Sequence, residues 1–181
     1  MKLLSPKTDI SRPITDRIKE SLFNILYKYG IPEGKAVADL FCGVGSLGIE
    51  ALSRNAEFVT FVENDARIVE TLEKNIEKSV FMKNSMVVKA NAFRFSPRFY
   101  SPVELYDLMF VDPPYSESRD TSFDSKLGIL LCSLGNYLVE NGIVVVRTEK
   151  KVHLLEKYGD LSIIERREWG GMAVALLQRE I

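Results

Sequence analysis

The chain of 181 residues contains only two cysteines and one histidine, and this scarcity excludes several kinds of site. Cys42 and Cys132 are too few for a disulfide framework, and with His153 alone beside them we expect no metal site. The single histidine also argues against Ser-His-Asp hydrolysis, because no glycine-flanked serine accompanies it. No apolar run reaches the roughly 18 residues of a membrane span, and residues 1–7 show no signal-peptide run. We therefore expect a cytoplasmic protein that makes no contact with a membrane.

The remaining composition is that of one globular domain, with 46% hydrophobic and 27% charged residues. The net charge is −1, but residues 1–35 carry seven basic against four acidic side chains, so this segment is at +3 and the remainder at −4. The basic bias is typical either of a contact with phosphates or of an ordinary solvated helix face. We assign residues 1–30 to an N-terminal extension with a helix and residues 31–181 to the main domain, and we expect a monomer.

Strand-like and helix-like runs alternate along the chain, which predicts an α/β fold with helices on both faces of a mostly parallel sheet. Thr15 can cap a first helix whose apolar positions run from Ile18 to Tyr29. Gly170-Gly171 joins the last two strands, which predicts an antiparallel hairpin. The pattern predicts seven strands at 36–41, 58–62, 86–90, 106–111, 143–146, 161–169 and 172–178, with further helices through 49–52, 68–76 and 124–138.

A glycine-rich turn follows the first predicted strand. Gly43, Gly45 and Gly48 match G-x-G-x-x-G, which lets a backbone turn sharply and approach a ligand closely. Glu63, at the end of the second strand, is placed to accept two hydrogen bonds from a ribose diol. A dinucleotide and S-adenosylmethionine (SAM) both carry such a ribose. Asp39 favours SAM, because its carboxylate would repel a pyrophosphate and attract an ammonium or sulfonium group.

Asp112-Pro113-Pro114-Tyr115 ends the fourth predicted strand. Two prolines fix the backbone, so a carboxylate and a rigid carbonyl can together accept both hydrogens of a planar exocyclic amine. Tyr115 adds an aromatic face on which a base can stack. The segment therefore predicts a site for a nucleobase amine.

These four residues resemble the D/N/S-P-P-Y/F/W motif of SAM-dependent amino-methyltransferases. Residues 12–17 and 22–26 closely resemble the R-P-T-T-D-R and L-F-N opening of the RsmD family, and residues 39–54 match that family's D-L-F-x-G-x-G-x-L-G-x-E-A-L-S-R stretch. The resemblance extends over nearly the whole chain from Arg12 onward. It implies a Rossmann-like class I SAM-dependent methyltransferase fold and methyl transfer to the N2 amine of a guanine in small-subunit (16S) ribosomal RNA.

The resemblance implies a site at the strand ends, with SAM as cofactor and ribosomal RNA as partner. Asp112 and the Pro113 carbonyl would hold the amine, Asp112 would accept its proton, and Tyr115 would hold the base. The catalytic residues are expected to be Asp112, Pro113, Pro114 and Tyr115, and the RNA-binding residues Arg12 and Tyr115. The cofactor-binding residues are expected to be Thr15, Arg17, Asp39, Phe41, Gly43, Gly45, Glu63, Asn64, Asn91, Ala92 and Asp112.

Two departures from the family pattern and several alternatives stay open. Only eleven residues precede Arg12, where the family commonly has a longer basic hairpin, and Asn91 stands where related enzymes have Asp. Arg12 and Arg17 could meet RNA phosphate, the SAM carboxylate, or Asp16 or Glu20 in a helix N-terminal ion pair. The alternative functions are an adenine-N6 nucleic-acid methyltransferase, a protein glutamine methyltransferase, an NAD-dependent oxidoreductase and a non-catalytic RNA-binding protein.

Overall fold

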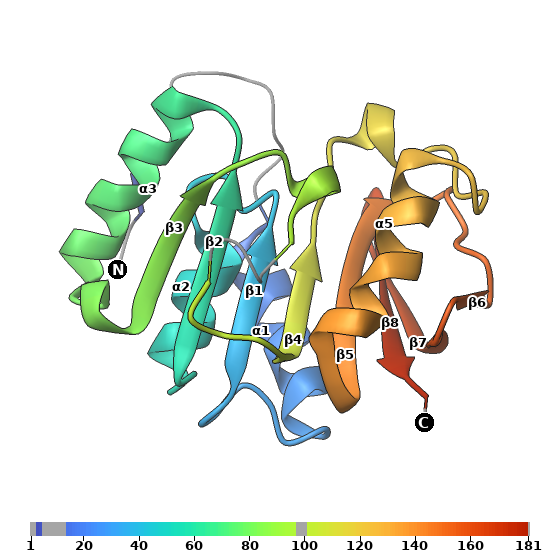
Figure 1. Ribbon diagram of the computed structural model, residues 1–181, viewed down its shortest axis with the longest axis horizontal. Helices are drawn as coiled ribbons and strands as arrows, with labels where there is room; N and C mark the ends of the chain where they lie inside the picture. The colour runs from blue at the N-terminus through green and yellow to red at the C-terminus, as the bar shows by residue number, and fades with distance from the viewer. Residues whose placement is uncertain (1–2, 5–13, 97–100, 181) are drawn as a thin grey trace.

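The computed structural model describes residues 3–4, 14–96 and 101–180. These residues form an eight-stranded sheet with the order β3-β2-β1-β4-β5-β8-β7-β6, covered by helices on both faces (Figure 1). The first five strands in this order are parallel, and β8 runs antiparallel to both of its neighbours. The strands are β1 (Ala36–Leu40), β2 (Phe58–Glu63), β3 (Ser85–Lys89), β4 (Tyr106–Val111), β5 (Leu138–Glu149), β6 (Lys157–Tyr158), β7 (Leu161–Trp169) and β8 (Met172–Arg179).

The helices pack in two layers whose apolar side chains form the two halves of the core. α1, α2 and α3 pack on one face of the sheet and α5 on the other. Thr15 caps α1 as expected, its hydroxyl accepting from the backbone N–H of Ile18 at 3.4 Å. None of the helices in the described ranges has the length and apolar character needed to cross a membrane. The α-helices are α1 (Asp16–Tyr27), α2 (Ser46–Ser53), α3 (Ala66–Ser79) and α5 (Lys126–Leu134), and the short 3₁₀ turns are η1 (Met82–Asn84), η2 (Ala92–Arg94), η3 (Tyr115–Glu117) and η4 (Gly135–Tyr137).

The expected α/β fold with a C-terminal antiparallel hairpin is confirmed, but the expected number of seven strands is wrong. The additional strand, β6, has two residues and pairs only with β7, so it is too short to show a period-2 alternation. The fifth strand begins at Leu138, not at 143, because the chain turns into the sheet directly after η4. The preceding helix correspondingly ends at Leu134 and not at 138.

The hairpin inserts its second strand into the sheet. β7 and β8 meet at Trp169 and Met172, with Gly170 at a φ of +57° in the turn. β8 lies between β5 and β7 and pairs with β5 over seven residues. β8, the last strand within residues 101–180, is therefore an interior strand.

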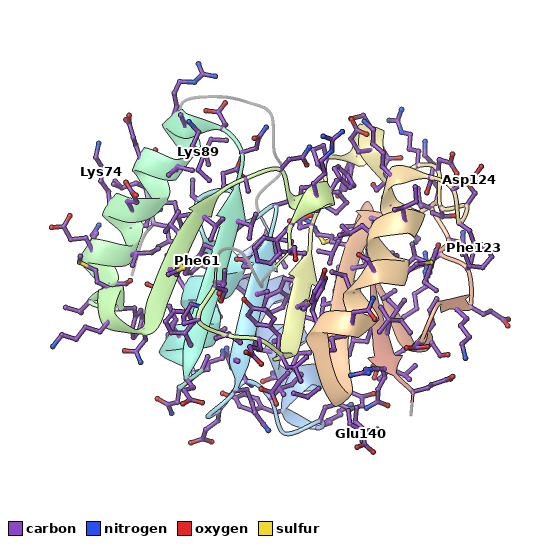
Figure 2. All side chains as sticks on the ribbon, viewed as in Figure 1. Phe61, Lys74, Lys89, Phe123, Asp124 and Glu140 are labelled. Atoms are coloured by element: carbon purple, nitrogen blue, oxygen red, sulfur yellow. The ribbon has the colours of Figure 1, made fainter. Side chains whose placement is uncertain are left out.

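The five parallel strands finish at one edge of the sheet, and this edge carries the predicted site residues that follow β1, β2, β3 and β4. Figure 2 labels Lys89 at the carboxyl end of β3 and Glu140 near the beginning of β5, so the carboxyl ends lie at the top of that view. Ligands of open α/β sheets bind beyond the carboxyl ends of the strands. The region after β1, β2, β3 and β4 is therefore the place to look for chemistry.

Candidate active site

The turn between β1 and α2 has an unusual backbone. Phe41, Gly43 and Gly45 all have positive φ values, of 60°, 54° and 86°. A side chain at Gly45 would also place its Cβ 2.5 Å from the Leu72 side chain of α3, whereas the space around Gly43 is open. Phe41 is not a glycine, so its left-handed conformation stores strain of the kind that concentrates at binding sites. The expected glycine turn is present, with open space at Gly43 beside the sheet edge.

The third glycine of the motif serves a different purpose. A Cβ at Gly48 would lie 2.3 Å from the ring of Phe61 and 2.9 Å from Val59. Gly48 therefore lets α2 pack closely on β2, and it makes no cradle for a ligand.

Asp39 is a buried carboxyl at the end of β1. Its side chain is 1% exposed, and its Oδ2 accepts the backbone N–H of Gly48 at 2.8 Å. The pKa of Asp39 is raised from its ordinary 3.8 to about 7, mainly by burial. The charges of Asp112 and Glu63 contribute to this rise, and the Gly48 N–H and the Arg147 charge oppose it. A cation bound near Asp39 would therefore lower the pKa of this carboxyl and stabilise its ionised form.

Glu63 ties the second strand to the glycine turn. One carboxylate oxygen accepts the backbone N–H of Gly43 at 3.1 Å, and the other accepts those of Asn64 and Asp65 at 2.8 and 2.9 Å. Asn64 is thereby placed by its backbone, while its side chain is exposed. The carboxylate is thus fixed beside Gly43, and both of its oxygens accept backbone N–H groups.

Asp112 follows β4 and lies directly beside the end of β1. Its backbone N–H donates to the Leu40 carbonyl at 3.4 Å. Its side chain is 18% exposed, and Oδ1 accepts from the guanidinium Nε of Arg147 at 2.6 Å. Burial raises the pKa of Asp112, and the charge and hydrogen bond of Arg147 oppose that rise. The structure therefore supplies Asp112 with an ion-pair partner that the motif alone does not reveal.

The rest of the D-P-P-Y segment leads into η3. Pro113 is buried, Pro114 is exposed and Tyr115 is half-buried. The carbonyls of Pro114 and Tyr115 accept the backbone N–H groups of Glu117 and Ser118 at 2.9 and 3.3 Å. The Pro114 and Tyr115 carbonyls are thus used within the turn itself.

The segment after β3 contributes an aromatic pair. The rings of Phe41 and Phe93 pack edge to face with centroids 4.7 Å apart. Asn91 is exposed, and its side-chain oxygen accepts the Phe93 N–H at 3.0 Å and so begins η2, where Ala92 is buried. Phe95 packs into the core. Of the two aromatic residues that follow Asn91, Phe93 therefore lies next to the glycine turn.

Among the described residues, the predicted site residues at the beginning of α1 make no hydrogen bond or ion pair with Asp39, Glu63 or Asp112. Thr15 and Arg17 are exposed, and the Thr15 hydroxyl is used as the helix cap. Asp16 pairs with Lys19 at 3.3 Å and not with Arg17. Arg12 lies outside the described residues.

Arg147 is the residue of this site that motif reading missed. It follows the apolar run Val144–Val146 of β5, and an arginine at the end of a buried strand was the available signal. Its pairing with Asp112 follows from the parallel register of β4 and β5, in which Val111 lies opposite Val146. Together the strand ends bring Asp39, Glu63, Asp112 and Arg147 to one edge.

Comparison with known families gives a match over nearly the whole chain. The family described as Conserved hypothetical protein 95 matches residues 1–178. "Putative rRNA methyltransferase YlbH" of Bacillus subtilis is 34% identical over 171 residues, which are 93% of this chain and 88% of that protein. "Ribosomal RNA small subunit methyltransferase D" of Escherichia coli K12 is 32% identical over 179 residues, which are 99% of this chain and 85% of that protein.

Solved structures show the same fold. "Putative methyltransferase yhhF from Escherichia coli" superimposes with a TM-score of 0.79 at 30% identity, covering 99% of this chain and 92% of that one. An RNA methyltransferase from Salinibacter ruber, in complex with S-adenosyl-L-homocysteine, has a TM-score of 0.67 at 15% identity, covering 93% of this chain and 94% of that one. The second likeness is one of fold alone.

Proposed function

The chain belongs to the family described as Conserved hypothetical protein 95, the RsmD family, and from that premise we propose that it is an rRNA methyltransferase. Its substrate is the exocyclic N2 amine of a guanine in small-subunit ribosomal RNA, and SAM is the methyl donor. Relatives at 32% to 34% identity that carry rRNA methyltransferase names support this proposal. Within it, residues 31–181 form the methyltransferase domain and residues 1–30 form its leading extension.

One observation carries the proposal: the D-P-P-Y segment begins beside the end of β1, where the glycine turn also begins. The Asp112 N–H donates to the carbonyl of Leu40, the last residue of β1 before that turn. A donor held over the turn and an amine held by Asp112 would then be neighbours, and most of the rate enhancement of such a transfer comes from positioning. The NAD-dependent alternative leaves this adjacency without a use.

The residues at the turn suit SAM. Asp39 is a buried carboxyl with its pKa raised to about 7, so a sulfonium or ammonium nearby would stabilise its charge. Glu63 beside Gly43 is placed to accept from ribose hydroxyls, and Phe41 and Phe93 offer apolar rings for an adenine. Bound SAM supplies an activated methyl group on sulfur.

The chain's own part in the reaction is to hold the guanine amine. The N2 lone pair is delocalised into the ring, so the amine is a weak nucleophile until its hydrogens are held out of the ring plane. Asp112 accepts one N–H and the Pro113 carbonyl accepts the other, and the Asp112 carboxylate stabilises the positive charge that develops on nitrogen. Asp112 then takes the proton, while the Tyr115 ring holds a base splayed out of its stack.

Methyl transfer to small ribosomal subunits that lack base methylation tests the proposal. With methyl-labelled SAM, we expect label in N2-methylguanosine after digestion of the RNA, and a signal in N6-methyladenosine would contradict the assignment. Asp112→Ala is expected to abolish turnover while leaving SAM affinity by calorimetry within about threefold, since the side chain acts on the amine. Turnover by this variant close to that of the unmodified protein would remove Asp112 from the mechanism.

A further inference from the structure

We propose that Arg147 is a positioning residue for Asp112, holding its carboxylate in the orientation that accepts the substrate amine. The inference rests on the proposed function, in which Asp112 receives the amine hydrogens. It assigns a role to a side chain that lies outside the glycine turn and the D-P-P-Y segment.

The geometry of the pair favours orientation over simple charge balance. The Arg147 Nε lies 2.6 Å from Oδ1 of Asp112, and the two side chains are 11% and 18% exposed. An ion pair that is largely removed from solvent holds a fixed geometry, whereas an exposed pair contributes little. Because Oδ1 accepts a hydrogen bond from the guanidinium, rotation of the carboxylate is restricted, and in this proposal Oδ2 is the oxygen that accepts the substrate amine.

The backbone that carries Arg147 is rigid. β5 is an interior strand, paired in parallel with β4 and antiparallel with β8, where Arg147 lies opposite Val174. Asp112, by contrast, sits at the beginning of a loop that leads through two prolines into η3. The strand can therefore hold the loop acid in place, and the precision of the site depends on this support.

The charges around the pair also support a role for Arg147 in keeping Asp112 ionised. Arg147 on β5 faces Asp112 directly, and Asp39 on β1 interacts with Asp112 electrostatically, so a second carboxyl lies close to the pair. Burial raises the pKa of Asp112, and Arg147 opposes that rise while also lowering the pKa of Asp39. Without the guanidinium, Asp112 would take up a proton at a higher pH, and the neutral acid is a poorer acceptor for an amine N–H.

Three variants separate this role from a purely structural one. Arg147→Met removes the charge at similar length, and Arg147→Lys keeps the charge but loses the planar fork. Arg54→Met is the matched control, because the Arg54 Nε makes a similar pair with Glu50 at 2.7 Å and 19% and 24% exposure. That pair lies at the end of α2, away from the carboxyl ends of the strands.

Two readouts are compared: the pH profile of kcat on ribosomal subunits and the titration of the Asp112 carboxyl by carbon-13 NMR, assigned with Asp112→Asn. For Arg147→Met we expect kcat at pH 7 to fall about 10- to 100-fold. The difference in kcat between Arg147→Met and the unmodified protein should become smaller as the pH rises. In the variant, the Asp112 carboxyl should titrate at a higher pH than in the unmodified protein. In Arg147→Lys, Asp112 should titrate at the same pH as in the unmodified protein, but kcat should be only partly restored. Arg54→Met should change neither the Asp112 titration nor kcat.

The outcomes distinguish the inference from the proposed function. An Arg147→Met profile lowered equally at every pH, with an unshifted Asp112 titration, overturns the inference and leaves the function intact. If the unmodified protein does not methylate guanine, the proposed function fails and with it the role of Arg147 in orienting an amine acceptor. Should Arg147→Met fail to fold, Arg147→Lys decides: an unchanged kcat would overturn the need for the guanidinium geometry.

Discussion

Replacing Asp39 with asparagine is expected to stabilise the ligand-free protein at alkaline pH. The folded chain raises the pKa of Asp39 from 3.8 to about 7. The folded state therefore binds the proton more tightly than the unfolded state between about pH 4 and pH 7, and the free energy of unfolding falls as pH rises through that window. Each pKa unit is worth about 1.4 kcal/mol, so the ionised Asp39 costs about 4 kcal/mol above pH 7.

Asparagine keeps the shape and the acceptor for the Gly48 N–H but carries no charge. The free energies of unfolding of the two proteins, measured by urea denaturation, should be nearly equal at pH 4. As the pH rises, the free energy of unfolding of Asp39→Asn should increase relative to that of the unmodified protein. The difference should reach a plateau of about 4 kcal/mol by pH 8. SAM affinity should fall in the same variant, since the counter-charge for its cationic groups is gone.

A second substitution of aspartate by asparagine is expected to change the free energy of unfolding in the opposite direction. Asp65 caps α3 and bonds to Arg67, and these contacts lower its pKa, so Asp65→Asn should lose stability at neutral pH and not gain it. A gap between Asp39→Asn and the unmodified protein that stays constant from pH 4 to 8 would refute the burial argument. So would a variant that is less stable at pH 8.

Two further predictions follow from the site. Glu63→Ala should lower SAM affinity by about 10- to 100-fold in calorimetry, because a charged acceptor beside Gly43 is lost, and unchanged binding would remove Glu63 from the cofactor site. Gly48→Ala should lower the free energy of unfolding by about 1–3 kcal/mol through the clash with Phe61, labelled in Figure 2, while Gly171→Ala, where the space is open, should be neutral. Equal melting temperatures for these two glycine variants would contradict the packing argument.

The fold was predictable from the sequence where the signal is local. Apolar runs that end in turn residues located β1, β2 and β4, and the Gly170-Gly171 pair located the hairpin. β6 was missed because two residues carry no periodicity. The early part of β5 was missed because Asn141-Gly142 is typical of a turn, yet Asn141 takes a φ of +60° within the strand, where the register with β4 shifts.

The parts of the candidate site that lie at the ends of adjacent strands were also predictable from the sequence. The positions of Glu63 beside Gly43 and of Asp112 beside β1 depend on adjacent strand ends, which the α/β pattern predicts. Arg147 was not found, because 35 residues separate it from Asp112 and the contact depends on the register between β4 and β5. The use of Asn91 as a cap for η2 was also missed, since Asn can bond either to a ligand or to its own backbone.

The interior position of β8 has a consequence for biosynthesis. Among the strands of the described residues, Met172–Arg179 is synthesised last, yet these residues must pair with β5 on one side and β7 on the other. Until they emerge, β5 presents an open edge and β6 and β7 have no attachment to the remainder of the sheet. We therefore expect the sheet to be completed only after Met172–Arg179 have emerged, and we expect a chain that stops before residue 172 to be prone to edge-to-edge aggregation.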